Sequence, residues 1–128
     1  MSPEGFLPDH LGVEWGEVVS GRASGRFTAK KHHMAPNGYL HAGSVVALAD
    51  SVCGFGCMAS RPQGAVSFTT IELKSNHLAT AREGVIHCVA KRVHAGRTTQ
   101  VWDAVVTHRE TGRTLALFRC TQMVLYPK

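Results

Sequence analysis

Residues 44–60 read SVVALADSVCGFGCMAS, a stretch that is long, apolar and without the alternation of a strand. The pattern predicts one helix, with Ser44 or the residue before it near the N-terminal cap. Because the segment is apolar all round, we expect the helix to be central and not superficial. Gly54 and Gly56 each weaken a helix by roughly 1 kcal/mol relative to alanine. Burial on all sides would compensate for that loss.

The segments before this helix predict a hairpin and a loop. After a loose lead-in of nine residues, residues 13–19 and 23–30 have a β-type composition and are separated by the turn Ser20-Gly21-Arg22. Two such runs around a short turn are typical of a β-hairpin. A loop rich in histidine, proline and glycine, residues 32–43, then leads to the helix.

The rest of the chain is β-like, in the runs 66–78, 85–93, 98–108 and 114–126. The separators are three to five residues long, so we expect consecutive strands to pair antiparallel. The last run is apolar on both faces, and a second subunit is expected to cover the face that the helix does not. One face carries Leu115, Leu117, Met123 and Leu125, and the other carries Ala116, Phe118, Cys120 and Val124.

A long antiparallel sheet wrapped around one apolar helix is the hotdog architecture, an α+β fold. We expect residues 1–128 to form a single domain of this kind, because the length suits one domain. Apolar residues make up 44% and charged residues 18%, which excludes a disordered chain. No uninterrupted run of apolar residues approaches the length of about 18 that spans a bilayer, and no secretory signal is recognisable, so a cytoplasmic protein without a membrane partner is expected.

The charge and the cysteines narrow the classes of partner. The formal net charge of +5 favours anionic partners such as nucleic acid, membrane headgroups or a phosphorylated small molecule. Aromatic and basic residues do not interleave as they do on an RNA-binding sheet, so nucleic acid is not expected as a partner. The four cysteines lack a zinc spacing and are expected to be buried free thiols. They are Cys53, Cys57, Cys88 and Cys120.

Asp50 is the sharpest chemical signal, because it is the only acidic or basic residue between His41 and Arg61. A carboxylate buried in such apolar surroundings costs several kcal/mol unless it has a partner. Asp50 is therefore either paired for structure, for example with a facing histidine, or retained for function.

The start of the helix is the second signal. The first N–H groups of a helix have no internal partner, so the end at His41-Ala42-Gly43 could bind a polarised carbonyl oxygen, or the small residues could simply permit a turn. Asp50 lies eight residues beyond Ala42, about 12 Å along the axis at roughly 1.5 Å per residue. Two antiparallel helices from two subunits could aim both groups at one carbon. The spacing therefore predicts a homodimer with two shared sites.

His41-Ala42-Gly43 followed by Asp50 resembles the His-Gly-Gly-x6-Asp/Glu signature of hotdog-fold acyl-CoA thioesterases. The phenylacetate-pathway and 4-hydroxybenzoyl-CoA types are the nearest match. Residues 69–77, 96–99 and 110–116 are also similar, so the resemblance spans most of residues 25–125. It implies a cytoplasmic hydrolase that cleaves an acyl-CoA to the free acid and coenzyme A, as a homodimer or homotetramer.

The resemblance also implies roles for five residues. Asp50 matches the catalytic carboxylate, acting as nucleophile or as the base that activates water. Ala42 matches the first glycine of the signature, whose backbone N–H polarises the thioester carbonyl. His41 matches the histidine that shapes the same turn, His77 one that positions substrate or water, and Thr70 a hydroxyl that holds the water.

Strand parity offers other readings for two of these residues. His77 shares its parity with Ile71 and Leu73, so it could equally be a core histidine. Thr70 has the opposite parity, with Glu72, and could be a solvated strand residue. A bulge in the strand would change either interpretation.

Two departures from the family pattern concern the water and the acyl group. Ala35 stands where the family often has Asn or Gln, and Asn37 could replace it if the loop is re-registered. Gly54 stands where some relatives have a hydroxyl. Small residues of the helix are expected to make room for an aryl group: Ala47, Cys53, Gly54 and Cys57.

Further contacts are expected for the rest of the substrate. Gly43 belongs to the turn that would bind the thioester. The resemblance places the contacts to the phosphates of coenzyme A at Arg82 and in the turn that contains Arg97, Thr98 and Thr99. These four residues could otherwise simply lie in solvated turns.

No metal or redox cofactor is expected. His32 and His33 are adjacent in an extended loop and therefore point apart, and no third ligand has a suitable spacing. Two other functions stay open. One is a non-catalytic hotdog protein that binds acyl-CoA, and the other is a hydratase or dehydratase of acyl thioesters.

Overall fold

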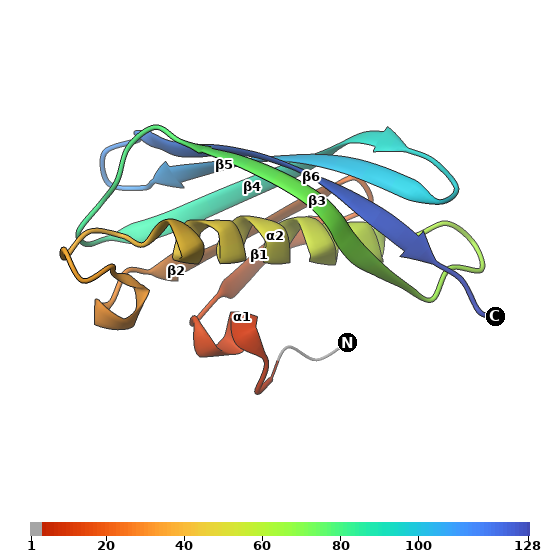
Figure 1. The fold of residues 1–128 in the computed structure, drawn as a ribbon, viewed down its shortest axis with the longest axis horizontal. Helices are drawn as coiled ribbons and strands as arrows, with labels where there is room; N and C mark the ends of the chain where they lie inside the picture. The colour runs from red at the N-terminus through yellow and green to blue at the C-terminus, as the bar shows by residue number, and fades with distance from the viewer. Residues whose placement is uncertain (1–3) are drawn as a thin grey trace.

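The computed structural model describes residues 4–128 and shows one six-stranded antiparallel sheet curved around one long helix (Figure 1). This arrangement confirms the predicted hotdog fold. The elements in chain order are α1 (Leu7–His10), β1 (Glu14–Val19), β2 (Arg22–Thr28), the 3-10 turn η1 (Lys31–His33), α2 (Ala42–Ala59), β3 (Ser67–His77), β4 (Val85–Ala95), β5 (Thr99–His108) and β6 (Thr114–Leu125).

Helix α2 begins two residues earlier than Ser44, because the side chain of His41 caps it. The Gly43 amide donates a hydrogen bond of 2.7 Å to Nδ1 of His41. A Cβ on Gly43 would lie 2.9 Å from the same ring atom, so glycine is needed where the imidazole folds over the first turn.

Gly54 and Gly56, in the second half of α2, let the sheet approach the helix. A Cβ on Gly54 would lie 2.8 Å from the ring of Phe68, and one on Gly56 would lie 2.5 Å from the ring of Trp102. Trp102 is fully buried at the centre of the core. The helix is long and apolar enough for a membrane span. It nevertheless packs against all six strands, as the core helix of a soluble protein does.

The strands follow the order β1-β2-β4-β5-β6-β3. The predicted hairpin is confirmed, and so are the antiparallel pairs β4–β5 and β5–β6. The predicted pairing of β3 with β4 is wrong, because β3 pairs with β6 at the sheet edge and β4 pairs with β2. The connection between them crosses the sheet and is fixed to the N-terminal half: the Leu40 amide donates to the Ala81 carbonyl, and the Ala29 amide donates to the Gly84 carbonyl.

Strand β3 contains a bulge that shifts its register between Thr70 and Glu72. Before the bulge, Thr70 pairs with Gln122 of β6; after it, Leu73 pairs with Cys120. Both partners are buried on the inner face of β6. Thr70 therefore lies on the same face of the sheet as Leu73, and the simple parity that assigned Thr70 to the solvated face is wrong.

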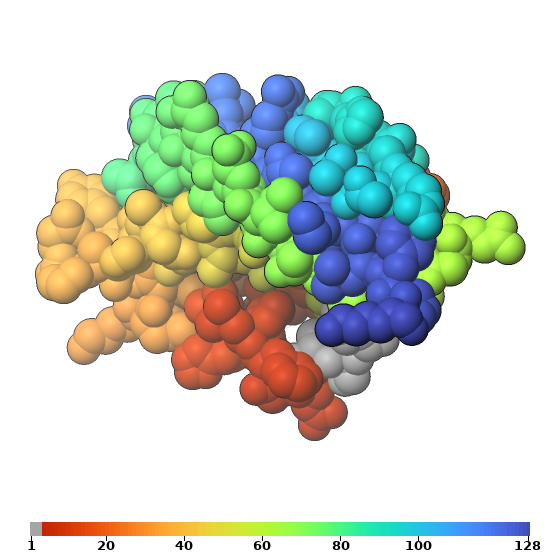
Figure 2. All heavy atoms as spheres, turned by 45° about the vertical axis from the view of Figure 1, so that its right-hand side comes forward, coloured from red at the N-terminus to blue at the C-terminus, as the bar shows by residue number. Residues whose placement is uncertain are grey.

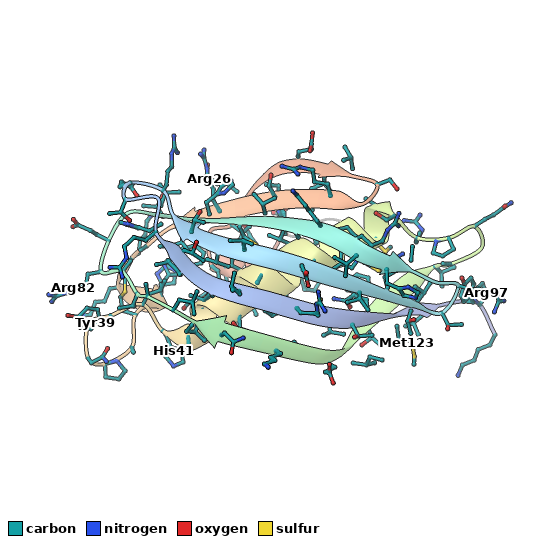
Figure 3. All side chains as sticks on the ribbon, turned by 90° about the horizontal axis from the view of Figure 1, so that it is seen from above. Arg26, Tyr39, His41, Arg82, Arg97 and Met123 are labelled. Atoms are coloured by element: carbon teal, nitrogen blue, oxygen red, sulfur yellow. The ribbon has the colours of Figure 1, made fainter. Side chains whose placement is uncertain are left out.

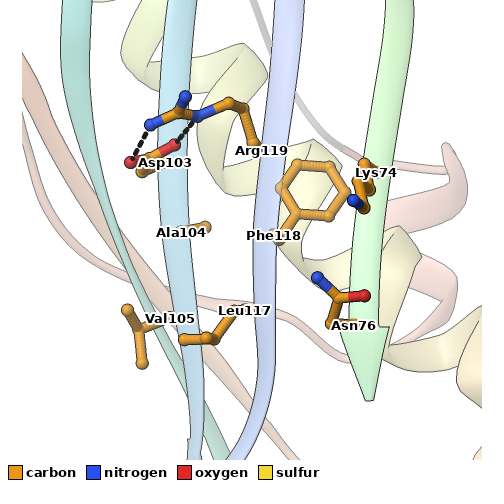
Figure 4. A pocket seen from close by; sticks show the side chains of 8 residues that line it. All are labelled: Lys74, Asn76, Asp103, Ala104, Val105, Leu117, Phe118 and Arg119. Atoms are coloured by element: carbon orange, nitrogen blue, oxygen red, sulfur yellow. Dashed lines mark hydrogen bonds and ion pairs between the residues drawn. The ribbon is translucent and has the colours of Figure 1, made fainter.

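The outer face of the sheet is partly apolar and is exposed in the described chain. Leu117 is 46% exposed and Val105 is 40% exposed, which agrees with the expectation of an unmatched face. A hollow of about 280 Å³ lies on this face, beside the ion pair of Asp103 and Arg119 (Figure 4). The hollow is separated from α2 by the sheet, so it does not belong to the site built around the helix.

Candidate active site

Asp50 is positioned by the middle of α2 and lies half-buried against β3. The Thr70 hydroxyl is 2.8 Å from Asp50 Oδ1. Among residues 4–128, no group donates to the second carboxylate oxygen, Oδ2. The partner is therefore a hydroxyl and not a facing histidine, and it leaves one oxygen open for chemistry.

Behind Thr70 lies a buried amide that the sequence analysis did not select. Gln122 is fully buried, and its side-chain amide is 2.9 Å from the Thr70 hydroxyl. The other end of the same amide is 3.4 Å from Cys120 Sγ. The strand pattern held the signal, because Gln122 is the polar residue on the apolar face of the last strand.

The N-terminus of α2 borders a cavity of about 430 Å³. The Gly43 amide is occupied by the His41 ring, but the Ala42 amide donates to no acceptor within the described part of the chain. A free N–H at the positive end of a helix suits a carbonyl oxygen that gains negative charge. The cavity brings together three of the predicted residues, Asn37, His41 and Ala42, with Ala35, Tyr39, Leu40 and Thr80.

The Asp50 region and this cavity are separate within one chain. Strand β3 runs antiparallel to α2, since Thr70 meets Asp50 and Thr80, just past the strand, meets Ala42. His77 consequently lies toward the N-terminal end of α2; it is exposed, and its side chain has no hydrogen bond to any of the described residues. The predicted catalytic residues thus form two groups, and one chain does not join them.

The predicted nucleotide contacts also fall into two groups, at opposite ends of the sheet (Figure 3). At one end the Arg82 guanidinium stacks over Tyr39, 5.1 Å from the ring centre. At the other end Arg97 stacks over Tyr126 at 4.9 Å, next to Thr98 and Thr99. Neither tyrosine was predicted from the sequence, and each stacks against one of the two arginines.

The small residues of α2 do not leave an acyl pocket within one chain. The ring of Phe68 fills the space beside Gly54, and Cys53 and Cys57 are fully buried. The hydrogen bond of Cys53 to Cys120, together with burial, raises the pKa of the Cys53 thiol far above its usual range. Burial raises the pKa of Cys57 to about 11. These thiols are therefore protonated and are not nucleophiles.

His33 links the cavity wall to the N-terminal segment. It is buried and stacks on Phe27. Its Nδ1 accepts from the Lys30 amide at 2.9 Å, so Nε2 carries the proton and donates to the Leu11 carbonyl at 2.7 Å. Its own carbonyl accepts from the His41 amide and the Ser44 hydroxyl, and so fixes the start of α2.

Comparison with known proteins establishes the family. The model of the thioesterase superfamily matches residues 37–120. The chain belongs to the thioesterase superfamily. It is 33% identical over 115 residues to a 1,4-dihydroxy-2-naphthoyl-CoA hydrolase of Listeria monocytogenes, a match that covers 90% of this chain and 92% of the relative.

Two solved structures have the same fold as this chain. A mutant thioesterase of Pseudomonas aeruginosa superposes with a TM-score of 0.89 at 27% identity, covering 96% of this chain and 88% of that one. The PaaI protein of the phenylacetic acid degradation operon of Escherichia coli shares the fold, with a TM-score of 0.84 at 20% identity over 92% and 83% of the two chains. The resemblance to hotdog thioesterases is confirmed, and the chain is a thioester hydrolase.

No group of three or more His, Cys, Asp and Glu side chains within residues 4–128 is arranged to hold a metal ion. The chemistry available from the described side chains is that of a carboxylate, a hydroxyl and a helix N-terminus.

Proposed function

We propose that this thioesterase hydrolyses an aryl-CoA to the carboxylic acid and free coenzyme A, with Asp50 as the catalytic carboxylate. The observation that carries the proposal is the arrangement of Asp50: one oxygen is held by Thr70 and the other is open. Such a carboxylate can attack the thioester carbonyl itself or take a proton from an attacking water. Direct attack expels the thiolate of coenzyme A, which takes a proton from solvent, and leaves a mixed anhydride on Asp50 that water then hydrolyses to the free acid. In the other route Asp50 takes a proton from the water as it attacks, the carbon–sulfur bond breaks, and that proton passes to the leaving thiolate.

The free amide of Ala42 polarises the carbonyl in this mechanism. Negative charge develops on the carbonyl oxygen during attack, and a fixed N–H at the helix N-terminus stabilises it. His41 holds the turn by capping the Gly43 amide. Asn37 lines the same cavity and supplies the amide that Ala35 lacks. His77 positions the substrate or the water from the end of β3.

The catalytic unit in this proposal is a homodimer with two shared sites. On one chain Asp50 lies about 12 Å along the axis from Ala42, at roughly 1.5 Å per residue. An antiparallel pair of α2 helices would set Ala42 of one chain opposite Asp50 of its partner. Part of α2 (yellow) lies at the surface below β3 (green), so a partner can reach it (Figure 2). The exposed apolar outer face supports a homotetramer of two such dimers.

The same pairing would join the two groups of nucleotide contacts. Arg82 lies at the N-terminal end of α2, and Arg97 lies at the opposite end of the sheet, with Thr98 and Thr99. In an antiparallel dimer, Arg82 of one chain would lie near Arg97 of the other. Guanidinium and hydroxyl groups are suited to binding the phosphates of coenzyme A.

The substrate class follows from the relative and from the location of the site. The Listeria relative is named for an aromatic acyl-CoA, which supports an aryl substrate here. Because Gly54 is covered by Phe68, the acyl group would lie between the subunits and not within one core. No metal or redox cofactor takes part in this hydrolysis, and we place the protein in the cytoplasm.

The first experiment measures the release of free thiol from 4-hydroxybenzoyl-CoA, phenylacetyl-CoA and hexanoyl-CoA. The proposal expects turnover of the aryl esters and a loss of about a thousandfold in kcat for Asp50→Asn. Glu72→Gln is the control. Glu72 is an exposed acid on β3, near Thr70, and its replacement should leave kcat unchanged. Full turnover by Asp50→Asn would remove Asp50 from the mechanism. Binding of the esters without hydrolysis would favour the non-catalytic alternative, and addition of water to an unsaturated acyl-CoA would favour a hydratase.

A second experiment tests the shared sites. Proline fits the first position of a helix and carries no N–H, so Ala42→Pro removes the proposed donor with little change in the backbone. Ala42→Pro and Asp50→Asn should each be inactive alone. When the two variants are mixed and exchange subunits, half of the dimers become heterodimers, and each heterodimer has one intact site of its two. One quarter of all sites is then intact, so the mixture should recover about a quarter of wild-type activity. Absence of recovery in a proven heterodimer would mean that each site is built within one chain.

A further inference from the structure

We propose that Gln122 is a positioning residue for the hydrolysis: its buried amide fixes the Thr70 hydroxyl so that the hydroxyl proton points at Asp50. The inference rests on the proposed function, since it assigns Asp50 the catalytic role. Gln122 itself touches neither substrate nor water.

The contacts form a chain of three side chains from the core to the site. Gln122 is fully buried on the inner face of β6, and Thr70 is its direct partner on β3. The Thr70 hydroxyl lies 2.9 Å from the amide of Gln122 and 2.8 Å from Asp50 Oδ1. The hydroxyl therefore stands between two polar groups, each within hydrogen-bond distance.

Counting protons fixes the direction of this chain. A hydroxyl carries one proton, and an ionised carboxylate has none to give. If the amide oxygen faced Thr70, the carboxylate and that oxygen would compete for the single proton. The two ends of an amide differ little in shape, so the hydrogen-bond network decides which way it faces. We therefore assign the NH₂ group to Thr70.

In this orientation the Thr70 hydroxyl has one donor and one acceptor. The structure has Gln122 Oε1 toward Thr70 at 2.9 Å and Nε2 toward Cys120 Sγ at 3.4 Å, so this assignment exchanges the two ends of the amide. After the exchange the Gln122 N–H donates to Thr70 Oγ1, the Thr70 hydroxyl donates to Asp50 Oδ1, and the Gln122 carbonyl faces the Cys120 thiol. Thr70 can then neither rotate away nor leave its proton elsewhere. A fixed donor on one carboxylate oxygen holds the open oxygen in the geometry for attack, and such preorganised contacts reduce the barrier to reaction.

Gln100 provides a matched control. It is the cross-strand partner of Gln122, on the same inner face, and is only 1% exposed. Its amide accepts from Trp102 Nε1 at 2.9 Å and donates to the Ser60 carbonyl at 3.1 Å, so it has no contact with Asp50. The two glutamines are therefore equally buried and lie opposite each other on β5 and β6. They differ in their hydrogen-bond partners, because only Gln122 contacts Thr70.

The test compares Gln122→Met with Gln100→Met, since methionine has a similar length and no amide. With 4-hydroxybenzoyl-CoA, Gln122→Met should lower kcat about tenfold and leave KM within about twofold. Gln100→Met should lower the unfolding temperature but keep kcat. If Gln122→Met does not fold, Gln122→Asn keeps an amide that is one methylene too short to reach Thr70, and the same loss is expected.

A double mutant separates positioning from general damage. Gln122→Met added to Thr70→Val should cost nothing further in kcat, because Gln122 acts only through the Thr70 hydroxyl. Wild-type kcat in folded Gln122→Met, or additive losses in the double mutant, would overturn the inference. Failure of the proposed function gives a different result, namely full turnover by Asp50→Asn.

Discussion

The Thr70 hydroxyl, on the edge strand β3, donates to Asp50 in the middle of α2 across 2.8 Å. The contact exists because β3 is bulged just after Thr70, which lets this residue face the helix. It connects the edge of the sheet to the central helix at the proposed catalytic carboxylate.

Replacing Thr70 tests this contact directly. Thr70→Val keeps the shape and removes the hydroxyl, so kcat should fall about tenfold or more, since Asp50 loses its donor. Thr70→Ser keeps the hydroxyl and should retain most of the activity. Steady-state kinetics with phenylacetyl-CoA measure both variants. Equal kcat for the two variants would contradict a role for the hydroxyl.

Arg82 should affect binding of the nucleotide and not the chemistry. Arg82→Gln should raise KM for an acyl-CoA about tenfold, because a guanidinium contact to phosphate is lost. KM for the same acyl group on pantetheine, which lacks the nucleotide, should not change. The exposed Arg109 is the control for loss of one positive charge, as Arg109→Gln. An equal rise in KM for both esters would place Arg82 elsewhere in the site.

Tyr39 should act through Arg82. Their stacking, at 5.1 Å, is worth about 0.5–1 kcal/mol at an exposed site, so Tyr39→Leu should raise KM for an acyl-CoA by about two- to fivefold. Tyr39→Phe keeps the aromatic face and should behave as the wild type. If Tyr39→Leu acts as strongly when Arg82 is already replaced, the tyrosine binds the substrate by itself.

His33 should make stability depend on pH. Burial lowers the pKa of His33 below its ordinary value, and the neighbouring charges of His32, Lys30 and His10 act in the same direction. The unfolded chain therefore takes up this proton first as the pH falls below about 6.5, and the free energy of unfolding decreases. The contribution is fully present above that pH and is lost as the pH falls toward the lowered pKa. Glu14 is a carboxylate that lines the same pocket as His33.

Urea unfolding near pH 8 and near pH 5.5 measures this effect. The wild type should lose up to about 1.4 kcal/mol per pH unit from His33, and His33→Asn should lose less. His87, whose pKa is also lowered by burial, titrates in both proteins, so the difference between them isolates His33. If the free energy of unfolding falls equally with pH in the two proteins, the assignment of a neutral His33 is contradicted.

Gly56→Ala should destabilise the fold although alanine is the better helix residue. Alanine gains about 1 kcal/mol of helix propensity, but its Cβ would lie 2.5 Å from the ring of Trp102, which is fully buried and cannot move freely. We expect a net loss of about 1–2 kcal/mol in the free energy of unfolding. Ser51→Ala, on the half-exposed side of the helix, should change it by less than about 0.5 kcal/mol.

The periodicity of the sequence was sufficient to predict helix α2 and the six strands, because hydrophobic pattern and turn residues are local. It missed α1 (Leu7–His10), which begins within the nine residues expected to be a loose lead-in. It could not predict that β3 pairs with β6 and not with β4. The order of strands depends on contacts between distant segments, such as the hydrogen bond from the Leu40 amide to the Ala81 carbonyl. The His41 cap lay outside the residues usually favoured at that position, which is why the helix starts earlier than predicted.

Much of the candidate site followed from the isolation of Asp50 and from the turn at Ala42. The pairing of Asp50 with Thr70 could not be predicted from strand parity, because a bulge leaves no clear mark in the sequence. Gln122 and Tyr39 were missed for another reason. Gln122 is marked in the sequence only as a polar residue on an apolar strand face, and Tyr39 is unremarkable in its loop. The packing of β6 against β3, and of Arg82 over the loop, gives each its partner.

The single extra residue in β3 also determines how this protein tolerates insertions and deletions. Deletion of one residue near Ile71 would remove the bulge and restore strict alternation of side chains along β3. Either Thr70 or residues 73–77 would then face the opposite side of the sheet. No chemical group would be lost, yet the carboxylate would lose its donor. The reactivity of this enzyme therefore depends on the number of residues in β3 as much as on their identity, because that number decides which side chains face Asp50.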